Sequence, residues 1–163
     1  SYIPTVASSA TRIADGFSRS NVYTNGFITA SGGTWFVELI NQIPYTRDNG
    51  NNTLILADLL GTNFFRLRND GSVNSNLRLQ KSISGITTDL FILPSGNVKI
   101  AVKWNGTTAD AFLNGTKIVS ATPFIATQLE NLTSVPQVPI FISQTILFPT
   151  ALSDSNCVTL TTI

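Results

Sequence analysis

The sequence predicts an all-β protein built as a two-sheet antiparallel β-sandwich, and three observations predict it. Strand-like apolar segments recur at intervals of about 8 to 12 residues, which is the spacing expected of a sandwich. No long window shows the apolar period of about 3.6 residues that marks a helix. Gly, Pro, Asn and Asp separate the segments and supply turn chemistry. Short strands of this kind bury their apolar faces by packing two sheets together.

The centre of the chain has the clearest strand pattern. Residues 98–120 (VKIAVKWNGTTADAFLNGTKIVS) contain three alternating segments, with an Asn-Gly pair at each break. Alternating side chains point to opposite faces of a strand, so the apolar residues of the first segment share one face. Asn114-Gly115 suits the two left-handed positions of a tight hairpin turn. We therefore expect an antiparallel meander over this range.

The remaining elements follow from the same pattern. The other predicted strands cover residues 34–40, 53–57, 63–68, 77–81, 89–93, 140–142 and 145–148. Helical signals are confined to one short turn that Ser153 can cap, and to a second candidate over residues 126–132. We find no internal repeat or linker, so residues 1–163 are expected to form a single domain. The chain starts at Ser1 rather than Met, which we interpret as part of a longer protein.

Composition argues against several classes of partner. Only 12% of the residues are charged and the net charge is +1, whereas a nucleic-acid binder usually carries a basic surplus. No apolar stretch approaches the roughly 20 residues that span a bilayer, so no membrane insertion is expected. The single cysteine, Cys157, permits no intrachain disulfide.

Catalytic and metal chemistry has few candidates in this sequence. The chain contains no histidine, which removes Ser-His-Asp and Cys-His machinery and makes a zinc site implausible. Glycoside hydrolysis needs two neighbouring carboxylates. Glu38 is the only acid within a strong strand pattern, and we interpret it as an outward-facing strand residue. We therefore predict no catalytic residue, no metal and no cofactor, while a glycan-cleaving enzyme that uses Glu38 stays as a remote alternative.

Two predicted strands, 63–68 and 77–81, carry an arginine-rich face. The residues predicted to point inward are Phe65, Leu67, Leu77 and Leu79, and those predicted on the opposite face are Phe64, Arg66, Arg68, Arg78 and Gln80. Arginine forks bind carboxylates and sulfates, and aromatic rings stack on sugars. The candidate binding residues for an acidic glycan or an acidic neighbour are Phe64, Arg66, Arg68 and Arg78. The alternative is a solvated face whose arginines shield the sheet.

Large apolar residues elsewhere have two interpretations each. Trp35 and Trp104 fall in register with strand apolar residues, which favours core packing over a sugar-stacking role. Phe112 and Val119 are predicted to form an outward apolar pair. Such a pair marks either a contact between subunits or a surface covered by a loop of the same chain.

Three segments resemble phage-encoded laminin-G-like, concanavalin A-like domains. The opening SYIPTVASSATRIAD (residues 1–15) resembles the entry motif of that family. VKIAVKWNGTTADAFLNGTKI (98–118) is similar to its paired strands with an Asn-Gly hairpin, and ILFPTALSDSN (146–156) is similar to its last strand and Leu-Ser-Asp turn. The three blocks follow the family order. Residues 156–160 depart from the family, because they read as a further strand where the family continues into a short helix.

The resemblance implies a concanavalin A-like jelly roll on a phage virion protein such as a tail fibre. It implies an adhesin at the extracellular surface of the virion that contacts host cell-surface polysaccharide. Fibre proteins of this kind are often trimers, so a homotrimer is expected. The alternative is a structural decoration or fibre-assembly module that binds other virion subunits. The family has no fixed sugar-binding motif that maps onto this chain.

Overall fold

The computed structural model describes residues 18–29, 31–42, 52–69, 76–125, 128–134 and 141–163. Within these ranges the chain forms eleven strands and one helix. The strands are β1 (Ser18–Arg19), β2 (Gly33–Gln42), β3 (Asn52–Asp58), β4 (Phe64–Arg68), β5 (Arg78–Ile83), β6 (Ile86–Ile92), β7 (Gly96–Trp104), β8 (Thr108–Leu113), β9 (Thr116–Pro123), β10 (Leu129–Ser134) and β11 (Phe141–Phe148), and the helix is α1 (Asp154–Thr161).

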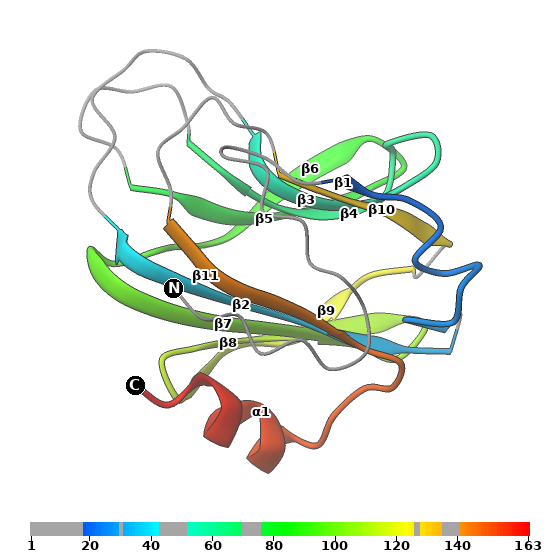
Figure 1. Cartoon of the computed structure of the whole chain (residues 1–163). Helices are drawn as coiled ribbons and strands as arrows, with labels where there is room; N and C mark the ends of the chain where they lie inside the picture. Colours follow the sequence, from blue (N-terminus) through cyan, green and yellow to red (C-terminus); the bar gives the residue numbers. More distant parts are fainter. Residues whose placement is uncertain (1–17, 30, 43–51, 70–75, 126–127, 135–140) are drawn as a thin grey trace.

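The strands form two antiparallel sheets packed face to face, so the fold is a jelly-roll β-sandwich (Figure 1). One sheet has six strands in the order β1-β10-β3-β4-β5-β6, and the other has five in the order β11-β2-β7-β8-β9. The predicted fold class is confirmed. The predicted segments 140–142 and 145–148 belong to the single strand β11, whose register shifts between Ile142 and Gln144, while residue 140 lies outside the described residues.

Every second side chain of a strand points between the sheets, and these inward-pointing side chains form the core. Its largest side chains include both tryptophans, and Trp35 and Trp104 are each 1% exposed. The ring of Phe65 on β4 contacts Trp104 on β7 and Phe124 after β9, with centroids 5.7 and 4.1 Å apart. The prediction that both tryptophans are core residues is confirmed.

Tight turns join the central strands. Asn114 and Gly115 connect β8 to β9 with φ of 46° and 80°, as the Asn-Gly pattern predicts, and the meander β7-β8-β9 is antiparallel. Ser84 and Gly85 make an equivalent turn between β5 and β6, with φ of 50° and 82°. A serine is not among the residues usually favoured at this position, which is why sequence reasoning missed this turn.

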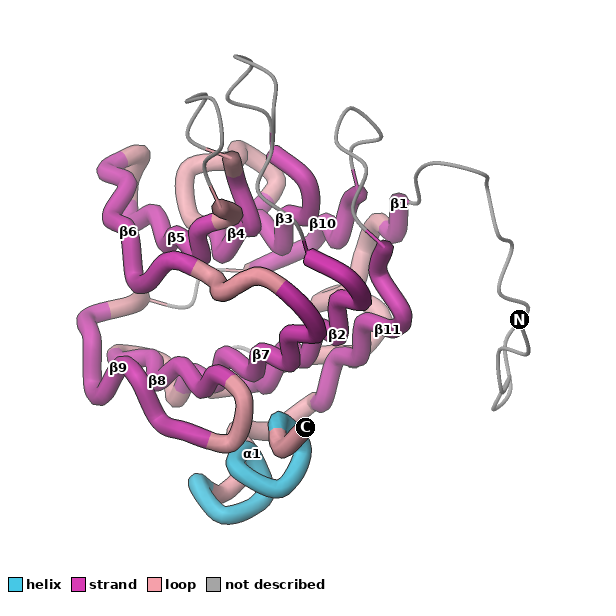
Figure 2. Tube along the Cα trace, turned by 90° about the vertical axis from the view of Figure 1, so that its left-hand side faces the viewer, coloured by secondary structure: helices cyan, strands magenta, loops and turns pink. Residues whose placement is uncertain are grey.

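A small second core lies on the outer face of the five-stranded sheet. Phe36, Ala101 and Phe112 are buried there against Cys157 of α1. Figure 2 shows α1 on the side of this sheet that faces away from the six-stranded sheet. The Ser153 side chain caps the helix by accepting a hydrogen bond from the Asn156 N–H at 3.2 Å, as predicted.

The prediction of a strand over residues 156–160 is wrong, because these residues are helical. Their β-branched composition is a weak local preference. The Ser153 cap and the burial of Cys157 against the sheet outweigh this preference, since short helices are stabilised mainly by packing. The helix predicted over 126–132 is also wrong where the structure describes it, since β10 starts at Leu129; residues 126 and 127 lie outside the described residues.

The predicted outward pair of Phe112 and Val119 does not form. Phe112 is fully buried beneath α1, so the same chain covers it. Val119 packs against the main core, because register shifts between β8 and β9 place it opposite the core residue Ala111. The interpretation of this pair as a subunit contact is therefore wrong.

Candidate functional site

The two sheets differ in how much of their outer face is available to a ligand. Helix α1 contacts β7, β8 and β9, and so covers part of the outer face of the five-stranded sheet. Within the described part of the chain, no helix or strand packs on the outer face of the six-stranded sheet. Among the described residues, that side therefore offers an extended ligand a sheet surface with no helix on it.

The predicted binding residues lie together on this open face. In the β4–β5 pair, Arg66 is opposite Gln80 and Arg68 is opposite Arg78. The alternate residues Phe65, Leu67 and Leu79 are buried in the core, as predicted. The face is completed by Asp89 of β6, opposite Gln80. We call this set the arginine face, defined as Phe64, Arg66, Arg68, Arg78, Gln80 and Asp89.

Hydrogen bonds connect the arginine face across three strands. The Arg66 Nε–H donates to Gln80 Oε1 at 2.7 Å, and the Gln80 side-chain N–H donates to Asp89 Oδ1. The second Asp89 oxygen pairs with Arg78 Nη1 at 2.6 Å. The Asp89 carboxylate therefore holds both the Arg78 guanidinium and the Gln80 side-chain amide in place.

Sequence reasoning missed Asp89. It lies in the predicted strand 89–93, but its partners depend on a register shift between Leu79 and Gln80 in the β5–β6 pair. A local pattern carries no signal for such a shift, because the extra residue is accommodated by cross-strand pairing. The shift is what places a carboxylate beside the arginines.

Phe64 plays a different part from the one predicted. Its ring is only 6% exposed, and the Arg66 guanidinium lies 4.5 Å from the ring centroid. The ring is therefore not an open platform for a sugar, which corrects the expectation of aromatic stacking. It supports the guanidinium through a cation–π contact.

The electrostatics of Arg66 are unusual for an arginine. Burial of the guanidinium and the neighbouring charge of Arg68 lower its pKa to about 10, and Asp89 acts in the opposite direction. The side chain is still charged at neutral pH. Arg68 and Arg78 are also directly opposite each other, an arrangement of like charges that usually costs stability in a sheet.

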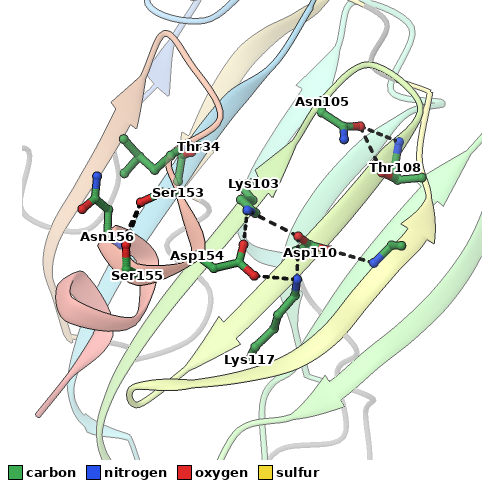
Figure 3. Close-up of polar contacts among 12 residues, drawn as sticks. Thr34, Lys103, Asn105, Thr108, Asp110, Lys117, Ser153, Asp154, Ser155 and Asn156 are labelled. Carbon is green, nitrogen blue, oxygen red and sulfur yellow. Dashed lines mark hydrogen bonds and ion pairs between the residues drawn. The ribbon is translucent and has the colours of Figure 1, made fainter.

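A second charged cluster lies where α1 meets the five-stranded sheet (Figure 3). We call it the helix clamp, defined as Lys103, Asp110, Lys117 and Asp154. Asp154 at the start of α1 pairs with Lys103 and, at 3.0 Å, with Lys117. Asp110 pairs with Lys117 at 3.0 Å and with Lys103 at 3.5 Å. All four charges are satisfied internally, so the helix clamp holds the helix and is a weak candidate for a ligand site.

The helix clamp shifts the pKa values of its members. Hydrogen bonds from Lys103 and Lys117 lower the pKa of Asp154. Burial alone would raise the pKa of Asp110, but the Ala121 N–H and Lys117 outweigh it and leave that pKa lowered. Asp110 and Asp154 in turn raise the pKa of Lys117.

We expect acid to weaken the fold partly through this cluster. The folded pKa of both aspartates is below the unfolded value of about 3.9, so their stabilisation is present above that pH and is lost as the pH falls through the folded values. Urea unfolding at about pH 6 and about pH 3 measures the loss. Asp154→Asn should reduce the difference in unfolding free energy between the two pH values. An unchanged difference would contradict the role given to Asp154. Because the pKa of Lys117 is raised, its ammonium group stays charged between about pH 3 and pH 6, and its own contribution to folding stability does not change over this range.

Glu38 lies on the outer face of the five-stranded sheet, 3.7 Å from the Lys99 ammonium and hydrogen-bonded by Gln144 at 3.2 Å. Among the described residues, no group of three or more His, Cys, Asp or Glu side chains is placed to hold a metal ion. No helix in the described ranges is both long and apolar enough to cross a bilayer.

Comparison with known proteins shows the fold alone. No protein-family model matches the sequence, and no curated protein sequence is similar to it. The CBM40 of the Ruminococcus gnavus IT-sialidase, bound to α2,3-sialyllactose, has a TM-score of 0.58 at 16% identity, over 94% of this chain and 96% of that chain. Domain 4 of the Geobacillus stearothermophilus arabinanase AbnA, in complex with arabinotriose, has a TM-score of 0.58 at 15% identity, over 83% of this chain and 69% of that chain.

A sialidase is also among the similar structures. The Trypanosoma rangeli sialidase in complex with the inhibitor DANA has a TM-score of 0.61 at 11% identity. The match covers 80% of this chain but 22% of the sialidase chain. The CBM40 and the arabinanase domain therefore match this chain over most of their own length, whereas only a part of the sialidase does.

Proposed function

We propose that this chain is a non-catalytic carbohydrate-binding module whose ligand lies on the outer face of the six-stranded sheet. The observation that carries the proposal is the contrast between the two outer faces. Helix α1 covers part of one face, and the other presents fixed polar groups across β4, β5 and β6. Saccharide sites need a few well-placed hydrogen-bonding groups on a rigid scaffold. The arginine face supplies both.

The similar structures support this proposal. The structures of the CBM40 and of the arabinanase domain are complexes with a sialyllactose and an arabinotriose, respectively. Those ligands belong to those proteins, and at the identities found their sites do not transfer residue by residue. What transfers is the scaffold, on which the residues of this chain provide their own chemistry.

We further propose that the module belongs to a phage fibre, lies at the virion surface and binds host cell-surface polysaccharide. The support is the sequence resemblance of residues 1–15, 98–118 and 146–156 to phage domains. A homotrimer with other virion subunits as neighbours fits the same proposal. Leu59, Leu60 and Ile86 are 71, 84 and 75% exposed at two adjacent hairpin tips, and apolar tips of this kind suit contacts within a fibre.

The test is saccharide binding by the isolated chain and its dependence on the arginine face. We expect an array of bacterial surface polysaccharides to identify a ligand, and Arg78→Ser to weaken its binding by about tenfold or more, since hydrogen bonds to charged groups contribute about 1.5–3 kcal/mol. Calorimetry measures the change. Lys99→Ser, which removes a paired cation from the opposite sheet, should leave affinity unchanged. No binding to any polysaccharide, or equal loss in both variants, would refute the proposed site.

A further inference from the structure

Arg66 is a guanidinium on the arginine face whose hydrogen-bonding capacity is only partly used by the described residues. Its Nε–H donates to Gln80, and within the described residues that is the one acceptor it contacts. Its two terminal nitrogens donate to no described acceptor. By contrast, the terminal nitrogen Nη1 of Arg78 pairs with Asp89, and the ammonium groups of Lys103 and Lys117 pair with two aspartates.

The Arg66 side chain is nevertheless held in place. The Phe64 ring supports one surface of the guanidinium at 4.5 Å, and Gln80 fixes its Nε. Asp89 in turn accepts from the Gln80 amide, so the Gln80 oxygen is turned toward the arginine. A guanidinium whose orientation is already set loses little entropy on binding a planar partner.

The surroundings of Arg66 also leave its positive charge incompletely compensated. Burial and the nearby Arg68 both disfavour the charged form, which is the cause of its lowered pKa. A ligand anion beside these two groups would relieve this repulsion. Together with the unused terminal nitrogens of Arg66, this arrangement points to an external anion.

We propose that the saccharide bound by the arginine face carries a carboxylate, and that this carboxylate pairs with the terminal nitrogens of Arg66. This inference rests on the proposed function and names the chemical class of its ligand. A carboxylate is favoured because a planar fork pairs with it through two parallel hydrogen bonds.

Asp89 has a second role in binding an acidic saccharide. Its negative charge lies on the same face and opposes an incoming anion, while its Oδ1 orients Gln80. Asp89 therefore sets the threshold for binding, so that a simple anion is bound poorly and an acidic sugar with further contacts is bound well. Asn at this position keeps an oxygen for Gln80 and removes the charge.

The test uses calorimetry at low ionic strength with three probes of equal length: trigalacturonic acid, its methyl ester and a sulfated neutral trisaccharide. We expect trigalacturonic acid to bind at least about tenfold more tightly than the ester. Arg66→Lys, which keeps the charge but loses the fork, should lose about tenfold for the acid and little for the ester. Asp89→Asn should strengthen binding of the acid several-fold, and added salt should reduce that gain.

Arg19→Lys is the matched control. Arg19 also lies over an aromatic ring, 4.7 Å from the centroid of Phe27, and the substitution, like Arg66→Lys, keeps the charge and removes the planar fork. We expect it to leave affinity unchanged. Circular dichroism and melting temperature confirm that each variant is folded.

The outcomes separate this inference from the proposed function. Binding of neutral saccharides that Arg66→Lys does not affect would overturn the carboxylate assignment and leave the module a carbohydrate binder. Preference for the sulfated probe would also overturn it. Absence of binding to these probes and to every polysaccharide on the array would defeat both proposals.

Discussion

Replacing Phe112 by Ala is expected to lower the free energy of unfolding by about 3–5 kcal/mol, the range for truncation of a buried aromatic side chain. The ring is fully buried between the five-stranded sheet and α1, and it contacts the small core that includes Phe36 and Cys157. Its loss leaves a cavity under a helix of eight residues, which is too short to be stable without this contact. Urea unfolding monitored by circular dichroism measures the change.

The control for this prediction is Ile118→Ala on the neighbouring strand β9. Ile118 is 47% exposed, so its truncation should change stability by less than about 1 kcal/mol. Light scattering adds a second readout. If Phe112→Ala altered the association state and left the stability of the monomer intact, the placement of Phe112 beneath α1 would be refuted.

Replacing Trp104 by Ala is expected to cost a similar amount, about 3–5 kcal/mol. Trp104 is 1% exposed in the core between the sheets, and its indole contacts the ring of Phe65 on the opposite sheet. Removing it opens a cavity that rigid sheets cannot close by small shifts. Urea unfolding again provides the measurement, and saccharide binding by the folded fraction should persist, because Trp104 is remote from the outer face.

A second substitution, at Gly33, tests the packing of Trp104 directly. A Cβ at this position would lie 2.5 Å from Cζ2 of Trp104, so Gly33→Ala is strained in the native protein. In the Trp104→Ala background the same methyl group has space and should cost less. A double-mutant cycle should therefore show coupling between the two sites, and additive effects would contradict the packing described.

The arginine face and the helix clamp differ in how far they can be predicted from sequence. Side chains alternate between the two faces of β4 and β5, and this alternation can be read from neighbouring residues. It therefore correctly places Arg66, Arg68 and Arg78 on one face. The partnership with Asp89 depends on a register shift, and the helix clamp depends on Asp154 reaching strands more than thirty residues away in sequence. Neither leaves a periodic signal in the chain.

Sequence alone determined that this protein is a sandwich of short antiparallel strands, where most strands lie, and that Asn114-Gly115 turns between two of them. Alternating hydrophobicity and turn chemistry encode these features within a few neighbouring residues. Only the tertiary structure decided that residues 154–161 form a helix, that this helix buries Phe112, and that none of the described helices or strands covers the outer face of the six-stranded sheet. These outcomes depend on which surfaces meet after folding, because packing overrides weak local preference.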